Sequence, residues 1–170
     1  HTLRANAAAR RNVAGYSFGG YGFTSCGYTT ANVGTTERFD DTANTHTARA
    51  NAVARRFLTG YSFGNYGFTS CGYTTAGVGT TERFDDTANT HTLRANAVAR
   101  HYPAGYSFGG YGFTSCGYTT ANVGTTERFD DTANTHTARA NAVARRELAG
   151  YSFEEEAPTG QFMSPMTKYW

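Results

Sequence analysis

The sequence has very little lysine and few charged residues of any kind. Lys168 is the only lysine among 15 basic residues, charged residues make up 16% of the 170 positions, and the formal net charge is +2. A nucleic-acid-binding protein normally needs a concentrated basic surface, so we expect no nucleic-acid partner. Arginine in place of lysine favours fixed, bidentate pairs with carboxylates.

Long apolar runs are also missing. No stretch of about 20 apolar residues occurs, so we expect no membrane span, and no signal peptide is recognisable after His1. The 20 glycines show no Gly-X-Y period, which excludes a collagen-like chain. Three cysteines are an odd number, so at least one stays unpaired within the chain. The compartment stays open, with an extracellular or particle-associated location favoured.

What the sequence does contain is a 45-residue repeat rich in aromatic residues, glycine, alanine and threonine. Three whole units cover residues 15–59, 60–104 and 105–149, and the first and third units are almost identical. A fixed period between 20 and 50 residues is typical of solenoids, propellers and other arrays. The aromatic content of 15% indicates a core of aromatic rings packed against small residues.

The two ends of the chain carry parts of a fourth unit. Residues 1–14 match the end of a unit, and residues 150–153 match its beginning. This split predicts either a ring that closes within one chain or a unit that is completed between neighbouring chains. Residues 154–170 form a non-repeating tail, which alternatively predicts a cap, since terminal repeats of linear arrays are atypical.

Alternation of residue types within a unit predicts three strand regions. In the first copy these are residues 14–23, 35–39 and 45–55. Clusters of turn-forming residues separate them. The run 50–56 also has the alanine and arginine content of a helix, which we keep as the alternative for that segment.

The segment 56–59 varies most between the copies. One position in it accepts Phe57, Tyr102 and Glu147, and the next position accepts Pro103. Proline cannot donate a hydrogen bond to a strand ladder. We therefore predict an exposed turn for this segment.

Each unit resembles a kelch repeat. It has a double glycine after an aromatic strand (Phe18-Gly19-Gly20), an aromatic–aspartate pair (Phe39-Asp40) and an arginine, Arg49, before the next strand. The matching residues of the later copies are Phe63-Gly64-Asn65, Phe84-Asp85, Phe108-Gly109-Gly110 and Phe129-Asp130. This chain departs from the family where histidine replaces tryptophan and where the double glycine is broken. Those positions are His46, His91, His136, Asn65 and Glu154-Glu155.

The resemblance implies an all-β fold, namely a kelch-like β-propeller of antiparallel blades of about 45 residues. Four repeat units per chain, one of them split between the termini, would form a four-bladed ring or half of an eight-bladed ring, since propellers have about four to eight blades. An open β-repeat stack or solenoid is the alternative. The resemblance extends to bacterial and phage proteins with near-identical repeats and implies no defined activity.

Cysteine and histidine recur with the repeat. Cys26, Cys71 and Cys116 are expected to be reduced and buried, with an interchain bridge or a reactive thiol as alternatives, because a disulfide needs Cα atoms within about 7 Å. The histidines are His1 and the three that replace tryptophan. Zinc sites usually show closely paired ligands, and the sequence has none, so we expect no metal ion, no other cofactor and no catalytic residue.

A charged set that recurs in every copy is predicted to form structural ion pairs. Its members are Arg38, Asp41, Arg49, Arg83, Asp86, Arg94, Arg128, Asp131 and Arg139. Bidentate Arg–Asp pairs would tie neighbouring strands or blades together. Paired carboxylates also suggest acid–base chemistry or Ca²⁺, but the spacing lacks the glycine and terminal glutamate of an EF-hand loop.

Six tyrosines, each beside a glycine, are predicted to line an interaction surface. They are Tyr21, Tyr28, Tyr66, Tyr73, Tyr111 and Tyr118. Surface tyrosine suits protein interfaces and sugar stacking. Packing in the core is the alternative role for these rings.

Near-identical units offer several equal surfaces, and no polar cluster is unique. The sequence therefore predicts a non-enzymatic repeat scaffold for protein interaction or self-assembly, as in a filament, an appendage or a particle. The expected partner is the chain itself, with another protein or a glycan as alternatives. A multivalent glycan-binding propeller is the second hypothesis, and an enzyme on a kelch-like fold is the least favoured.

Overall fold

Two β-hairpins in each 45-residue unit build one four-stranded antiparallel sheet. The first hairpin turns through Gly19 and Gly20, both at positive φ (59° and 81°), as the two-residue turn that matches the strand twist requires. The second turns through residues 41–44, where the Ala43 N–H donates to the Asp40 carboxylate at 3.0 Å. The local sequence thus fixes both turns.

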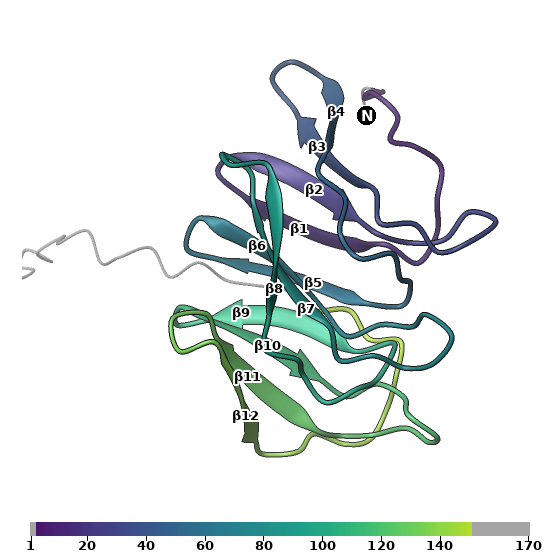
Figure 1. Ribbon diagram of the computed structural model, residues 1–170, viewed down its shortest axis with the longest axis vertical. Coiled ribbons are helices and arrows are strands. Elements are labelled where there is room, and N and C mark those ends of the chain that lie inside the picture. Colours follow the sequence, from purple (N-terminus) through teal and green to yellow (C-terminus); the bar gives the residue numbers. More distant parts are fainter. Residues whose placement is uncertain (1–2, 151–170) are drawn as a thin grey trace, which may run out of the picture.

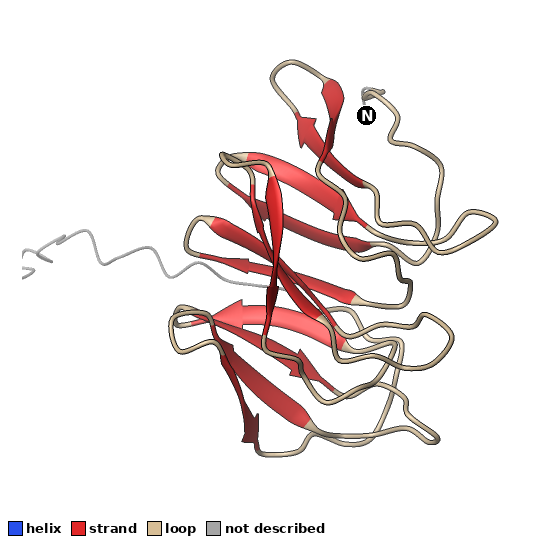
Figure 2. Ribbon diagram, viewed as in Figure 1, coloured by secondary structure: helices blue, strands red, loops and turns tan. Residues whose placement is uncertain are grey.

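The computed structural model describes residues 3–150, which contain twelve strands and no helix. Sheet 1 consists of β1–β4, sheet 2 of β5–β8 and sheet 3 of β9–β12 (Figures 1 and 2). The strands are β1 (Ala14–Phe18), β2 (Tyr21–Ser25), β3 (Thr36–Asp40), β4 (Thr45–Arg49), β5 (Thr59–Phe63), β6 (Tyr66–Ser70), β7 (Thr81–Asp85), β8 (Thr90–Arg94), β9 (Ala104–Phe108), β10 (Tyr111–Ser115), β11 (Thr126–Asp130) and β12 (Thr135–Arg139). The predicted all-β class is confirmed.

The three sheets follow one another along the long axis of the molecule (Figure 1). Strand β1 lies against β5, and β5 lies against β9, so the first strand of each sheet faces its neighbour. Residues 3–150 form an open array and do not close a ring (Figure 1). Residues 3–13 run beside sheet 1, whereas Gly150 lies against Gly105 of β9, so the two described parts of the split unit are at opposite ends. The predicted tail or cap lies outside the described residues.

The strand expected over residues 45–55 ends at Arg49. Residues 50–58, here called the linker, contain no regular strand and no helix, so the helical alternative is wrong as well. The linker's backbone bonds to the loop between β2 and β3 instead: the Ala52 N–H donates to the Gly34 carbonyl at 2.8 Å, and the Gly27 N–H to the Arg55 carbonyl at 2.9 Å. These contacts replace the hydrogen bonds that a strand or helix would supply.

The exposed turn predicted at residues 56–59 is also wrong in part. Leu58 is only 7% exposed, and Thr59 already begins β5. Leu58 packs with small residues from both flanking segments, namely Ala14, Cys26 and Ala52. Arg56 and the variable position Phe57 are half-buried and lie nearer the surface.

The main core lies between the sheets. Tyr16, Phe18 and Phe23 of sheet 1 stack on one another, and the Phe23 ring centroid lies 5.5 Å from that of Phe84 in sheet 2. The same cluster forms between sheets 2 and 3, with Tyr61, Phe68 and Phe129. Period-2 alternation places these rings on one face of each strand.

Glycine at one position of each unit allows this close approach. A methyl group added at Gly67 would lie 2.2 Å from Cε2 of Tyr16 in the preceding sheet, and one at Gly112 would lie 2.0 Å from Cε2 of Tyr61. The equivalent Gly22 of sheet 1 has no preceding sheet, and its nearest neighbour would be the Phe39 Cβ at 4.0 Å. The equivalent glycines of the three units therefore lie in two different environments.

We predict that Gly67→Ala destabilises the chain by about 1–3 kcal/mol, because the added methyl group overpacks the Tyr16 ring. Gly22→Ala is the matched control and should change the free energy of unfolding by less than about 0.5 kcal/mol. Urea unfolding of dilute protein, followed by tyrosine fluorescence, measures both. Equal effects of the two substitutions would contradict the inter-sheet packing.

Candidate interaction surfaces

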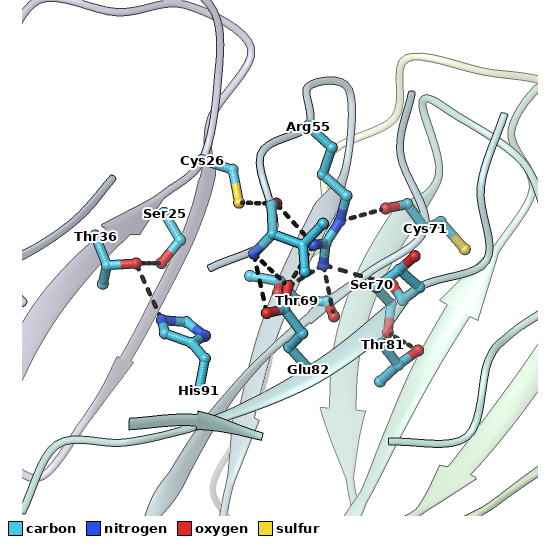
Figure 3. Close-up of polar contacts among 12 residues, drawn as sticks. Ser25, Cys26, Thr36, Arg55, Thr69, Ser70, Cys71, Thr81, Glu82 and His91 are labelled. Atoms are coloured by element: carbon cyan, nitrogen blue, oxygen red, sulfur yellow. Dashed lines mark hydrogen bonds and ion pairs between the residues drawn. The ribbon is translucent and has the colours of Figure 1, made fainter. Parts of the chain in front are cut away.

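A chain of hydroxyl groups crosses sheet 1 and ends on a histidine of sheet 2. The Tyr16 hydroxyl lies 2.7 Å from Ser25 Oγ. Ser25 Oγ lies 2.9 Å from Thr36 Oγ1, which lies 3.1 Å from Nε2 of His91 (Figure 3). The next copy repeats the chain through Tyr61, Ser70, Thr81 and His136. The histidine that recurs in each unit is therefore a junction residue between sheets.

Burial favours the neutral forms of the tyrosine and the histidine at the two ends of this hydrogen-bonded row. It raises the pKa of Tyr16 and lowers the pKa of His91, although the nearby Glu82 carboxylate partly opposes the shift of the histidine. Burial lowers the pKa of His136 in the same way. A neutral chain of hydroxyls and imidazole suits a structural junction between two sheets.

A buried arginine of the linker joins it to the following sheet. Arg55 is fully buried and pairs with Glu82, while its Nε donates to the Cys71 carbonyl at 2.9 Å and its Nη2 to Thr69 Oγ1 at 2.9 Å (Figure 3). The Val53 N–H also donates to the Glu82 carboxylate. The equivalent pairs are Arg10–Glu37 and Arg100–Glu127, each at 2.7 Å.

Two arginines of each sheet clamp one aspartate of the next. Arg38 and Arg49 contact Asp86 at 3.0 and 2.7 Å, and these side chains are 14–23% exposed. Arg83 and Arg94 contact Asp131 in the same way. The predicted Arg–Asp partners are thus brought together across the gap between sheets.

The ends of the array lack these contacts in part. Asp41 of sheet 1 pairs with Arg4 at 3.1 Å, and both side chains are largely exposed. Within residues 3–150, no carboxylate lies within 4 Å of Arg128, Arg139 or Arg145.

The six tyrosines singled out from the sequence are all half-buried and fall into two sets. Tyr21 lies under the Arg38 guanidinium at 4.4 Å, and the equivalent pairs are Tyr66–Arg83 and Tyr111–Arg128. Tyr28, Tyr73 and Tyr118 instead line one edge of the array, where Arg56 lies between the first two rings. They do not gather at one site.

The cysteines are free and buried at Cys26, Cys71 and Cys116. Burial raises the pKa of the Cys26 thiol to about 11 and that of Cys71 to about 12. These two thiols are therefore poor nucleophiles at neutral pH. Residues 3–150 hold no group of three His, Cys, Asp or Glu that could bind a metal ion.

The outer face of sheet 3 exposes groups that the inner junctions bury. Phe108 is 60% exposed, whereas its equivalent Phe18 is 9% exposed. A cavity of about 840 Å³ there is lined by Tyr106, Phe113, Thr126 and other residues. We call this surface the sheet-3 outer face.

The outer face of sheet 1 is the opposite half of the same junction. Phe39 is half-buried there, whereas its equivalents Phe84 and Phe129 are at most 1% exposed. A cavity of about 560 Å³ is lined by Phe39, Gly22, His46 and other residues. We call it the sheet-1 outer face. Neither face could be predicted from the sequence, because equivalent residues are buried in one unit and exposed in another.

No protein-family model matches the sequence, and no curated protein matches it. Solved structures do match, among them the structure of YjhT, with a TM-score of 0.64 and 8% sequence identity. That match covers 81% of this chain and 54% of the YjhT chain, so the chain spans about half the length of that structure. At this identity the likeness shows the fold alone. Residues 3–150 contain no helix that could span a membrane.

We predict that Asp86→Asn and Asp131→Asn each lower the free energy of unfolding by about 1–3 kcal/mol, since each substitution weakens two charge-assisted hydrogen bonds. Asp41→Asn, whose ion pair with Arg4 is exposed, is the matched control and should cost less than about 1 kcal/mol. Thermal melting of the three variants measures the difference. Unchanged melting temperatures for Asp86→Asn and Asp131→Asn would count against the clamp.

We also predict that stability falls as the pH drops below about 6.5, the ordinary histidine pKa. The folded chain holds the pKa of His91 and His136 below this value, so the unfolded chain binds more protons in that range and gains relative stability. Each histidine contributes at most about 1.4 kcal/mol per pH unit. A His91→Gln/His136→Gln variant should show a shallower slope in urea unfolding at a series of pH values. Identical slopes for variant and wild type would refute this assignment.

Proposed function

We propose that the chain is a non-enzymatic repeat scaffold for protein interaction or self-assembly. The observation that carries this proposal is the sheet-3 outer face, which exposes the aromatic and arginine groups that two internal junctions bury. Aromatic residues and arginine are enriched where proteins bind one another. Phe108, beside the half-buried Tyr106 and Phe113, provides an aromatic anchor for a partner.

Charge at this face supports a protein partner. Arg128 and Arg139 occupy the positions from which Arg38 and Arg49 clamp Asp86 at the first internal junction. A partner that presents a carboxylate between them would complete the clamp. Such charge-assisted, bidentate bonds give orientation as well as affinity.

We further propose that the sheets are blades of a kelch-like β-propeller. The support is the side-by-side packing of four-stranded antiparallel sheets through β1, β5 and β9, together with the likeness to the structure of YjhT. A ring needs about four blades or more. The three sheets would therefore need further blades, and the exposed outer faces are the places where these would join.

A glycan-binding propeller is the second candidate. The observation in its favour is the row of half-buried tyrosines along one edge, at Tyr28, Tyr73 and Tyr118. The row repeats at equal sequence intervals and would offer several equal sites. A glycan array without hits for the wild-type chain would remove this candidate.

We predict that Phe108→Ser abolishes association without loss of folding, because the exposed ring contributes to binding and little to the core of the free chain. Leu93→Ser is the matched control, since Leu93 is 64% exposed but lies on β8, away from both outer faces. Sedimentation velocity over a wide concentration range detects self-assembly beyond the 18.4 kDa chain, and affinity capture detects other proteins.

The scaffold proposal fails if wild type and Phe108→Ser sediment alike at 18.4 kDa and retain the same proteins. It gains support if Phe108→Ser alone loses either form of association.

A further inference from the structure

We propose that a second copy of this chain docks head to tail, so that its sheet-1 outer face packs on the sheet-3 outer face of the first copy. This inference rests on the proposed scaffold function and names the partner. The chain already contains the proposed junction twice, between sheets 1 and 2 and between sheets 2 and 3. Both halves are exposed once more, one at each end of the array.

The apolar parts of the two faces are complementary in shape. At the internal junctions a tyrosine ring lies on a glycine of the next sheet, as Tyr16 does on Gly67, and phenylalanine rings of the two sheets meet, as Phe23 and Phe84 do. Tyr106 and Phe113 present the rings on the sheet-3 outer face, stacked 5.2 Å apart. Gly22 and Phe39 line the receiving cavity of about 560 Å³ on the sheet-1 outer face.

The row of hydrogen-bonded hydroxyl groups in sheet 3 lacks the histidine that continues it at the two internal junctions. Tyr106, Ser115 and Thr126 are linked at 3.1 and 3.0 Å, and within residues 3–150 Thr126 has no histidine beyond it. On the sheet-1 outer face, His46 is the equivalent of His91 and has no preceding threonine in that range. Docking would bring Thr126 of one copy to His46 of the other, as the internal Thr–His contacts at 3.1 and 3.2 Å show.

Charge fixes the direction of the contact. Arg4 already pairs with Asp41 from the position that Arg49 takes on Asp86, so Arg128 of one copy would complete the clamp on Asp41 of the other, as Arg38 does on Asp86. Two sheet-3 outer faces together would instead bring arginine against arginine. The contact is therefore heterologous, and such contacts propagate into a closed ring or an open filament.

One segment must move before this contact forms. At an internal junction a single linker runs between the sheets, whereas two copies would bring both residues 3–13 and residues 140–150 to that place. Arg10 already holds the first segment, because it pairs with Glu37 and its side chain is only 3% exposed. The Arg145 side chain is exposed and pairs with no carboxylate of residues 3–150, and the segment is held mainly by its backbone, through Ala142 N–H to the Gly124 carbonyl at 2.8 Å and Gly117 N–H to the Arg145 carbonyl at 2.9 Å. We infer that residues 140–150 leave these backbone partners and that residues 3–13 replace them as the linker of the new junction.

The first test is Gly22→Ala in the full-length chain. Its methyl group meets nothing closer than 4.0 Å in the free chain, but at the docked junction it would strike Tyr106 of the other copy, as a methyl group at Gly67 would strike Tyr16. We expect a self-association Kd raised roughly tenfold to a hundredfold, with unchanged melting of dilute protein. Thr92→Ala, an equally small change on exposed β8, is the control.

The second test uses opposite charges. Asp41→Arg and Arg128→Asp should each weaken self-association in sedimentation velocity, because each removes one partner of the proposed ion pair between copies. An equimolar mixture of the two variants should restore a junction. In the mixture, the positive charge introduced in one variant can pair with the negative charge introduced in the other variant.

A monomeric wild type, a Gly22→Ala variant that associates normally, or a mixture without recovery would each overturn head-to-tail docking. Loss of binding to other proteins in Phe108→Ser, with Gly22→Ala unaffected, would overturn this inference and leave the scaffold proposal standing.

Discussion

The buried guanidinium of Arg55 is the interaction on which the sheet array depends. Linker 50–58 forms no helix or sheet, so its backbone groups need partners in the flanking sheets. Arg55 supplies the connection to sheet 2, because it pairs with Glu82 and donates to the carbonyl of Cys71, while its own carbonyl accepts from Gly27 of sheet 1. A charge removed from water costs several kcal/mol unless it is paired. The pair therefore holds two sheets and the linker in one arrangement.

Much of this architecture follows from the sequence. The period of 45 residues, the turn at Gly19-Gly20 and the alternation in β1 lead to repeated four-stranded sheets. The recurrent Arg and Asp residues suggest ties between sheets, although only the structure pairs two arginines with each aspartate. Alternation fails for the linker, because its small alanines satisfy a strand pattern while Arg55 requires burial against another sheet. The exposed turn predicted for residues 56–59 is wrong at Leu58, because the variability of the neighbouring position says nothing about Leu58, which is buried.

The candidate surfaces could not be predicted from residue types, since identical residues are buried in one copy and exposed in another. Phe18 and Phe108 share their local sequence, yet one is 9% and the other 60% exposed. The difference arises only from position in the array. In a repeat protein, stability comes from each unit and from its interfaces with neighbours, so the end units carry unused interface. This property connects the fold of the chain to the proposed role as a scaffold.

In the proposed head-to-tail junction, residues 3–13 serve as the linker between sheets of two different copies. The most direct measurement is an electron microscopy reconstruction of the wild-type assembly at a resolution that distinguishes the two outer faces. The account predicts copies joined with Phe39 of one beside Phe113 of the next, in a ring or a filament. Separate single copies, or pairs joined through two identical faces, would contradict it.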